Sequence, residues 1–130
     1  SLAPGIYGVS NHLLDTPWPK IGRTKAAFAR WCGNPGATDD PAPLFALLRD
    51  TERAPDEALP ATGVPLEWER MLSAPFIVSP NYGTRCSTVV TIDHDGNARF
   101  VERGFDPAGN AAGEVDYRFT LSAANGSRRR

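Results

Sequence analysis

The chain has 130 residues, a net charge of −1, 41% hydrophobic residues and 9% aromatic residues. This size and composition suit a single domain with one buried core. The near-neutral charge argues against a nucleic-acid or membrane-surface protein, and no apolar run is long enough to span a membrane.

The first third of the sequence predicts a short strand, a loop and a helix. Residues 6–10 alternate apolar and small side chains, which is typical of a strand, and such a strand needs a neighbour to pair with. Prolines are expected to keep residues 11–20 from forming a helix. Residues 23–32 have apolar side chains at helical spacing, with Phe28 and Trp31 on one face, and the Gly-Asn-Pro-Gly segment that follows ends this helix.

The middle third predicts two further helices and a brief strand. Asp40 is a good N-cap for a helix that runs to about Asp50. Residues 51–64 are rich in proline, alanine and charge, and they predict an irregular surface loop. A short helix is expected over 65–72, and the apolar residues 76–78 favour a short strand.

The last third changes to a period of two and predicts an antiparallel meander. Strands are expected over 84–93, 98–103 and 114–121, with an Asp-Gly turn between the first two. Residues 122–130 predict a flexible tail. The fold class is therefore α+β, an antiparallel sheet with helices, in a single domain covering residues 1–130. One face of the last strand holds Val115, Tyr117, Phe119 and Leu121.

The two cysteines, Cys32 and Cys86, are too far apart in sequence for a paired metal-binding motif, and we expect reduced thiols. Cys86 is expected to be buried within its strand. No spacing of histidine, cysteine or acidic residues predicts a metal site. Reduced thiols are typical of a cytoplasmic protein, and that is the location we expect.

Two polar residues are candidates for chemistry. Asn11 follows the first predicted strand, where its amide either donates to a developing oxyanion or caps the next turn. Arg85 opens a β-branched strand, so its guanidinium needs solvent, a carboxylate or a bound anion. Gly83, two residues earlier, suits an unusual backbone angle or a close approach of another segment. The residues alone leave these alternatives open.

Four blocks, in order along nearly the whole chain, closely resemble the NRDE family, also called the transport and Golgi organisation protein 2 family. The most diagnostic block joins a Gly-x-Ser-Asn turn to Leu-Asp-Thr-Pro-Trp-Pro-Lys. The family pattern also has an N-terminal half, with a cysteine after the initiator methionine and an Asn-Arg-Asp-Glu tetrapeptide. This chain has neither and resembles the C-terminal half only. The blocks are residues 5–20 (GIYGVSNHLLDTPWPK), 63–69 (GVPLEWE), 82–90 (YGTRCSTVV) and 100–103 (FVER).

The resemblance implies a fold like that of N-terminal nucleophile hydrolases, in which two antiparallel sheets lie between layers of helices. In such enzymes an asparagine from a later strand helps to bind the oxyanion, and a later arginine tunes the site. By position these roles match Asn11 and Arg85. Further candidates for ligand or oxyanion binding are Ser10, Tyr82 and Trp18, of which Trp18 either packs or lines a pocket mouth. No catalytic nucleophile is assigned to this chain.

Two functions remain open for the full protein. The preferred one is ligand binding and homeostasis, related to haem or to lipid and acyl-CoA metabolism, with haem as a possible cofactor. The alternative is a cysteine-type amide (C–N) hydrolase whose nucleophile lies in the N-terminal half. We expect this chain alone to be inactive, and to expose an apolar sheet face that binds the N-terminal half or a second copy. The available haem donors are His12, His94, Cys86 and Met71.

Overall fold

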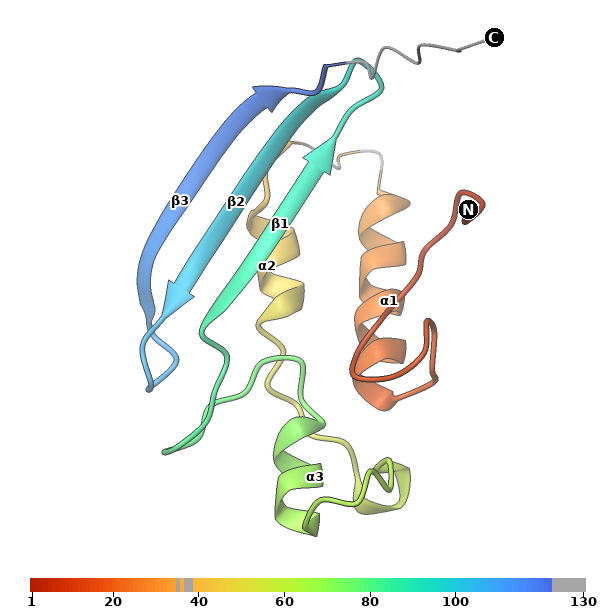
Figure 1. Cartoon of the computed structure of the whole chain (residues 1–130), viewed down its shortest axis with the longest axis vertical. Coiled ribbons are helices and arrows are strands. Elements are labelled where there is room, and N and C mark those ends of the chain that lie inside the picture. The colour runs from red at the N-terminus through yellow and green to blue at the C-terminus, as the bar shows by residue number, and fades with distance from the viewer. Residues whose placement is uncertain (35, 37–38, 123–130) are drawn as a thin grey trace, which may run out of the picture.

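The structure, a computed structural model, describes residues 1–34, 36 and 39–122. In these residues, helices lie on one side of a three-stranded antiparallel sheet of order β1-β2-β3, which confirms the predicted α+β class (Figure 1). Nearly all of the predicted tail, from residue 123 onward, lies outside the described residues. The elements are α1 (Pro19–Cys32), α2 (Ala42–Leu48), the 3-10 turn η1 (Asp56–Ala58), α3 (Leu66–Leu72), β1 (Cys86–Ile92), β2 (Asn97–Phe105) and β3 (Ala111–Thr120).

Proline and aspartate residues mark the starts of the first two helices. α1 begins at Pro19, earlier than predicted, because a proline at the first helical position loses no intrahelical hydrogen bond. The prediction that prolines block a helix up to residue 20 is therefore wrong at this position. α2 begins at Ala42 with Pro41 as its N-cap, so the prediction that Asp40 is the N-cap is wrong by one position. Asp40 instead stabilises the turn before the helix, because its Oδ1 accepts from the Ala42 N–H at 3.0 Å. No helix in the described part of the chain has the length and apolar character needed to cross a membrane.

Two predicted strands are not part of the sheet. Residues 6–10 pair with no described strand, so the strand predicted there is wrong as a sheet element. Residues 76–78 contribute only an isolated bridge between Val78 and Gly83. A Cβ atom on Gly83 would lie 2.9 Å from the Ile77 carbonyl oxygen, which confirms the close approach predicted for this glycine.

The helix-facing side of the sheet contains the core. β1 and β2 bring Val89 opposite Val101, and both belong to one buried cluster with Leu44 and Phe45 of α2. Aromatic side chains of α1, including Phe28, pack against the same cluster. The core therefore lies between α2 and the first two strands, and β3 extends beyond it.

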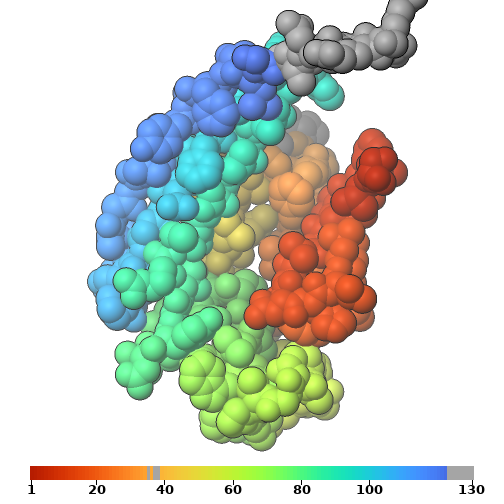
Figure 2. Space-filling view, viewed as in Figure 1, coloured from red at the N-terminus to blue at the C-terminus, as the bar shows by residue number. Residues whose placement is uncertain are grey.

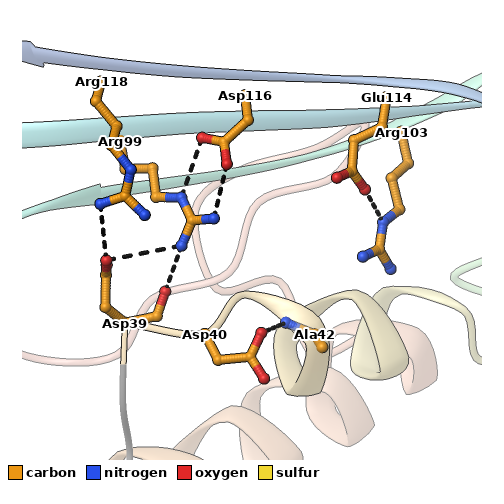
Figure 3. Close-up of polar contacts among 8 residues, drawn as sticks. All are labelled: Asp39, Asp40, Ala42, Arg99, Arg103, Glu114, Asp116 and Arg118. Atoms are coloured by element: carbon orange, nitrogen blue, oxygen red, sulfur yellow. Dashed lines mark hydrogen bonds and ion pairs between the residues drawn. The ribbon is translucent and has the colours of Figure 1, made fainter.

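β3 turns its charged side chains toward the helix side of the sheet, where they meet arginines of β2 (Figure 3). Arg99 Nη2 donates to Asp116 Oδ2 at 2.7 Å, and Arg99 Nη1 donates to the carbonyl oxygen of Asp39 at 2.6 Å, just before α2. Arg103 pairs through Nε with Glu114, and its guanidinium also lies over the Phe45 ring of α2. Ion pairs therefore join β2 and β3 on the helix side of the sheet.

The opposite face of the sheet is apolar, and no element among the described residues covers it. Because side chains alternate along a strand, the apolar residues of β3 point away from the helices. Tyr117 and Phe119 are 59% and 49% exposed, and Val90 and Ile92 of β1 are 53% and 58% exposed. This finding confirms the expected exposed apolar face. With Val115, these residues are called the free face below.

Candidate functional site

A groove of about 880 Å³ lies between the loop that precedes α1 and the region around α3. Its walls come from residues 11–20, from residues 60–64 and from α3, with Tyr82 contributed by the segment before β1. We call it the Trp18 groove, after the residue that immediately precedes α1. The groove therefore joins three parts of the chain that are far apart in sequence.

Asp15 fixes the loop that carries Asn11 and Trp18. Its backbone has a positive φ of 57°, and its N–H donates to the Gly8 carbonyl oxygen at 2.7 Å. The Asp15 carboxylate accepts from Lys25 Nζ at 2.6 Å and from the Gly8 N–H at 2.7 Å. The hydrogen bond from Lys25, and then the one from Gly8, lower the pKa of Asp15 below its usual range. The loop is thus tied both to α1 and to residues 6–10.

Aromatic rings contribute much of the groove wall. The ring centroids of His12 and Trp18 are 5.9 Å apart, and His12 Nδ1 lies 2.9 Å from Thr16 Oγ1. The other ring nitrogen has no hydrogen-bond partner among the residues that the structure describes. Tyr82 is held edge-on against Trp68 of α3, with ring centroids 5.7 Å apart. These rings suit a ligand with a flat or apolar body.

Three polar side chains complete the groove. The Asn11 amide has no hydrogen-bond partner among the described residues, so it is available to a ligand. Lys20 Nζ donates to the Leu72 carbonyl oxygen at 3.0 Å, and burial lowers the pKa of this ammonium group. Glu69 is buried and accepts from both the N–H and the hydroxyl of Thr62, at 2.7 and 2.5 Å. Glu69 therefore positions a wall, whereas Asn11 and Lys20 are the groups that can bind.

The predicted site residues divide between the groove and the surface around it. Asn11, Trp18 and Tyr82 line the Trp18 groove together. Ser10 lines a neighbouring groove on the other side of Lys20. Arg85 is exposed and lines neither groove, and no described carboxylate pairs with it. The structure therefore does not bring Arg85 together with Asn11.

Sequence reasoning missed two features of this groove. Lys20 ends the Pro-Trp-Pro-Lys block, and its position next to Trp18 was the signal available for it. Its ammonium lies 5.8 Å from the Trp18 ring centroid. Glu69 gave no signal, because only the fold brings this carboxylate next to Thr62.

The described residues contain no cluster of three histidine, cysteine or acidic side chains that could hold a metal ion. Both cysteines are free thiols, as predicted, but Cys86 is exposed and not buried. The physical reason is that Cys86 starts β1 on the same open side as Val90. His94 lies exposed in the turn between β1 and β2. Of the four haem donors considered, His12 is the one that lines the Trp18 groove.

Comparison with known proteins gives consistent matches. The family described as "Transport and Golgi organisation 2" matches residues 1–107. The Transport and Golgi organization protein 2 homolog of Bos taurus is 40% identical, over 82% of this chain and 42% of the relative. The Homo sapiens homolog is 33% identical, over 94% of this chain and 47% of the relative. The chain thus spans less than half the length of these relatives.

Proposed function

The chain belongs to the Transport and Golgi organisation 2 family, and we propose that the full protein binds a small amphipathic ligand in the Trp18 groove. The ligand class is haem or a lipid such as an acyl-CoA, and the role is ligand binding and homeostasis. The main support for this proposal is that one groove of about 880 Å³ combines aromatic walls with the amide of Asn11 and the ammonium group of Lys20. That size falls in the usual range of roughly 300–1,000 Å³ for small-molecule sites.

Each part of such a ligand has a complementary group. The rings of His12, Trp18 and Tyr82 would contact a flat or apolar body. Lys20 would pair with a carboxylate or phosphate, and this anion would favour the charged ammonium that burial disfavours. For haem, the open nitrogen of His12 is the axial donor that fits the groove.

Haem binding is tested by titrating haemin into the full protein and following the Soret band. We expect a shift that His12→Gln weakens by about tenfold or more, since axial ligation would be lost. His94→Gln is the matched control, because His94 lies in an exposed turn outside the groove. A shift that survives His12→Gln but disappears with His94→Gln would rule out ligation in the groove.

Lipid binding is tested with palmitoyl-CoA and tryptophan fluorescence. We expect palmitoyl-CoA to quench the fluorescence, and Trp18→Phe should remove most of this quenching. Trp31→Phe should leave the quenching unchanged, because Trp31 packs against the core. Lys20→Met should weaken binding, because the anionic head group would lose its counter-charge. If neither haemin nor palmitoyl-CoA binds, the ligand-binding proposal fails.

One observation favours a second function, a cysteine-type amide hydrolase. The Asn11 amide is free in the groove, and it could donate to the oxyanion formed when an amide carbonyl is attacked. On this proposal the nucleophile comes from an N-terminal half of the full protein. Asn11→Ala should then lower kcat of the full protein by about 10²–10³. Asn81→Ala, at an exposed site, is the control, and amide turnover that survives loss of the N-terminal cysteine contradicts this function.

We also propose that this chain forms the C-terminal half of a cytoplasmic protein whose remaining polypeptide covers the free face. Support comes from the exposure of Tyr117 and Phe119 and from the greater length of the relatives. Self-association of two chains through the free face is the competing arrangement. Light scattering on the isolated chain separates the two, because a stable dimer in dilute solution would favour self-association.

A further inference from the structure

Residues 6–10 have the side-chain pattern of a strand but no partner in the described structure. Ile6, Gly8 and Ser10 are half-buried, whereas Tyr7 and Val9 between them are 40% and 68% exposed. This alternation is the period of an extended strand packed on one face. Gly8 permits the packing, because a Cβ atom there would lie 2.6 Å from Cγ2 of Ile21 on α1.

The edge of β1 away from β2 pairs with no strand in the described part of the chain, and it faces the same space. It pairs with β2 through odd-numbered residues: the Arg85 carbonyl accepts from the Phe105 N–H at 2.8 Å, and the Asp93 N–H donates to the Asn97 carbonyl at 3.0 Å. In an antiparallel pair, alternate residues direct their N–H and C=O groups to opposite sides. The backbone groups of Thr88 and Val90 therefore point away from β2.

A groove of about 480 Å³ lies between these two backbone walls. Residues 6–10 line one side, and residues 88–90 of β1 line the other. Its floor is apolar and comes from helices α1 and α2, with Phe28, Leu44 and Leu48. Figure 2 shows the hollow between the red N-terminal segment and the teal strand β1. We call it the edge groove.

We propose that an extended strand fills the edge groove and pairs with β1 on one side and with the backbone of Tyr7 and Val9 on the other. The N–H and C=O of Gly8, between them, already bond to Asp15. Its inward side chains would be apolar, because they would meet the floor formed by Phe28 and Leu44. Its outward side chains would also be apolar, because they would lie between Val90 on one side and Tyr7 and Val9 on the other. The occupant is therefore a strand that is apolar on both faces.

This chemistry identifies the source as polypeptide of the same protein outside the matched stretch. The matched relatives have more than half of their length there, so such a strand has a place to come from. Strands that are apolar on both faces occur inside covered sheets. The β3 strand of a second copy does not fit, because it carries Glu114, Asp116 and Arg118 along one face. In one orientation these charges would lie on the apolar floor, and in the other they would lie beside the apolar free face. Both placements are unfavourable, because the charges would be next to apolar surface.

The test uses hydrogen exchange on the isotopically labelled full protein. We expect the amides of Thr88 and Val90 to exchange at least ~100-fold more slowly than amides without a hydrogen-bond partner. The Val89 amide, already bonded to β2, should be protected as well and serves as an internal control for folding.

A pair of variants at one position checks that the strand edge is responsible. Val90→Pro removes an outward N–H without removing a β1–β2 hydrogen bond, so it should lower the protection of the Thr88 amide by about tenfold or more. Val90→Ala keeps that N–H and should change the protection of Thr88 far less. Protection of Val89 in both variants would show that the chain still folds.

Two outcomes would overturn the proposal. The first is free exchange of the Thr88 and Val90 amides in the full protein while the Val89 amide is protected, which would mean that no strand pairs with this edge of β1. The second is protection of Thr88 and Val90 that disappears when a dimer of the full protein is diluted, which would make a second copy the occupant.

Discussion

Asp15 connects the candidate site to the rest of the fold through a single carboxylate. Lys25 and the Gly8 N–H both donate to it, and they hold the pKa of Asp15 below its usual range. Because the folded-state pKa lies below the unfolded one, this contact contributes stability above the unfolded pKa that is lost as pH falls through the folded value. Lys25→Met should raise the Asp15 pKa in a carboxyl NMR titration. An unchanged pKa would show that Lys25 is not the main cause.

Gly109 is fixed by both its backbone angle and its surroundings. Its φ is +80°, and a Cβ atom there would lie 2.8 Å from Cγ2 of Val78. Gly63 has a similar φ of +92° but open space around it, so it is the matched control. We expect each change to alanine to cost about 1–3 kcal/mol for the backbone angle, and Gly109→Ala to cost about 1–3 kcal/mol more for the overlap. Equal losses in urea denaturation would contradict the overlap.

At the scale of elements, β3 illustrates what alternation predicts and what it leaves open. The pattern around Tyr117 and Phe119 correctly predicts a strand, because alternation depends only on neighbouring residues. Alternation does not predict which of the two sets of β3 side chains faces the helices. That choice depends on Asp39 and Arg99, which are 60 residues apart in sequence and meet only in the fold. Long-range contacts also explain why residues 6–10 form no strand. Their alternation is local, but a strand forms only where a partner strand lies beside it.

The arginine pairs of the sheet allow a direct comparison within one element. The Arg99 side chain is 18% exposed and forms ion pairs with both Asp116 and Asp39, whereas the Arg118 side chain is 62% exposed and forms one ion pair within the described residues, with Asp39. Exposed single pairs contribute little to stability, whereas a more enclosed bidentate pair contributes more. We therefore expect Arg99→Ala to lower the midpoint of urea denaturation and Arg118→Ala to leave it nearly unchanged. The reverse order would show that the network on β3 is not stabilising.

The candidate site divides in the same way between local and long-range information. Asn11 and Trp18 belong to one recognisable block, so the sequence could indicate both. Tyr82 joins them because Trp68 holds its ring at the groove, a contact that no local pattern reveals. Arg85 was the converse case: its position in a block indicated a site role, but its side chain lies on the surface, outside both grooves.

For the whole molecule, the free face determines how the isolated chain behaves. Each ~100 Å² of apolar surface left in water forgoes about 2.5 kcal/mol, and typical domains are stable by only about 5–15 kcal/mol. We therefore expect this chain alone to be marginally stable or to aggregate. Tyr117→Thr combined with Phe119→Thr should increase the monomeric fraction in light scattering without lowering stability, because both side chains are about half exposed or more.

Val101→Thr is the contrasting substitution, because it changes a buried residue and not an exposed one. Val101 is 1% exposed in the core, so adding a hydroxyl there should destabilise the fold and should not improve solubility. If the unaltered chain melts cooperatively as a monomer at high temperature, exposure of the free face does not destabilise the chain, and no further polypeptide is needed to cover that face. If it instead gains stability only when the rest of the polypeptide is supplied, the sheet is one half of a shared core, and the two exposed aromatic residues of β3 belong to that core.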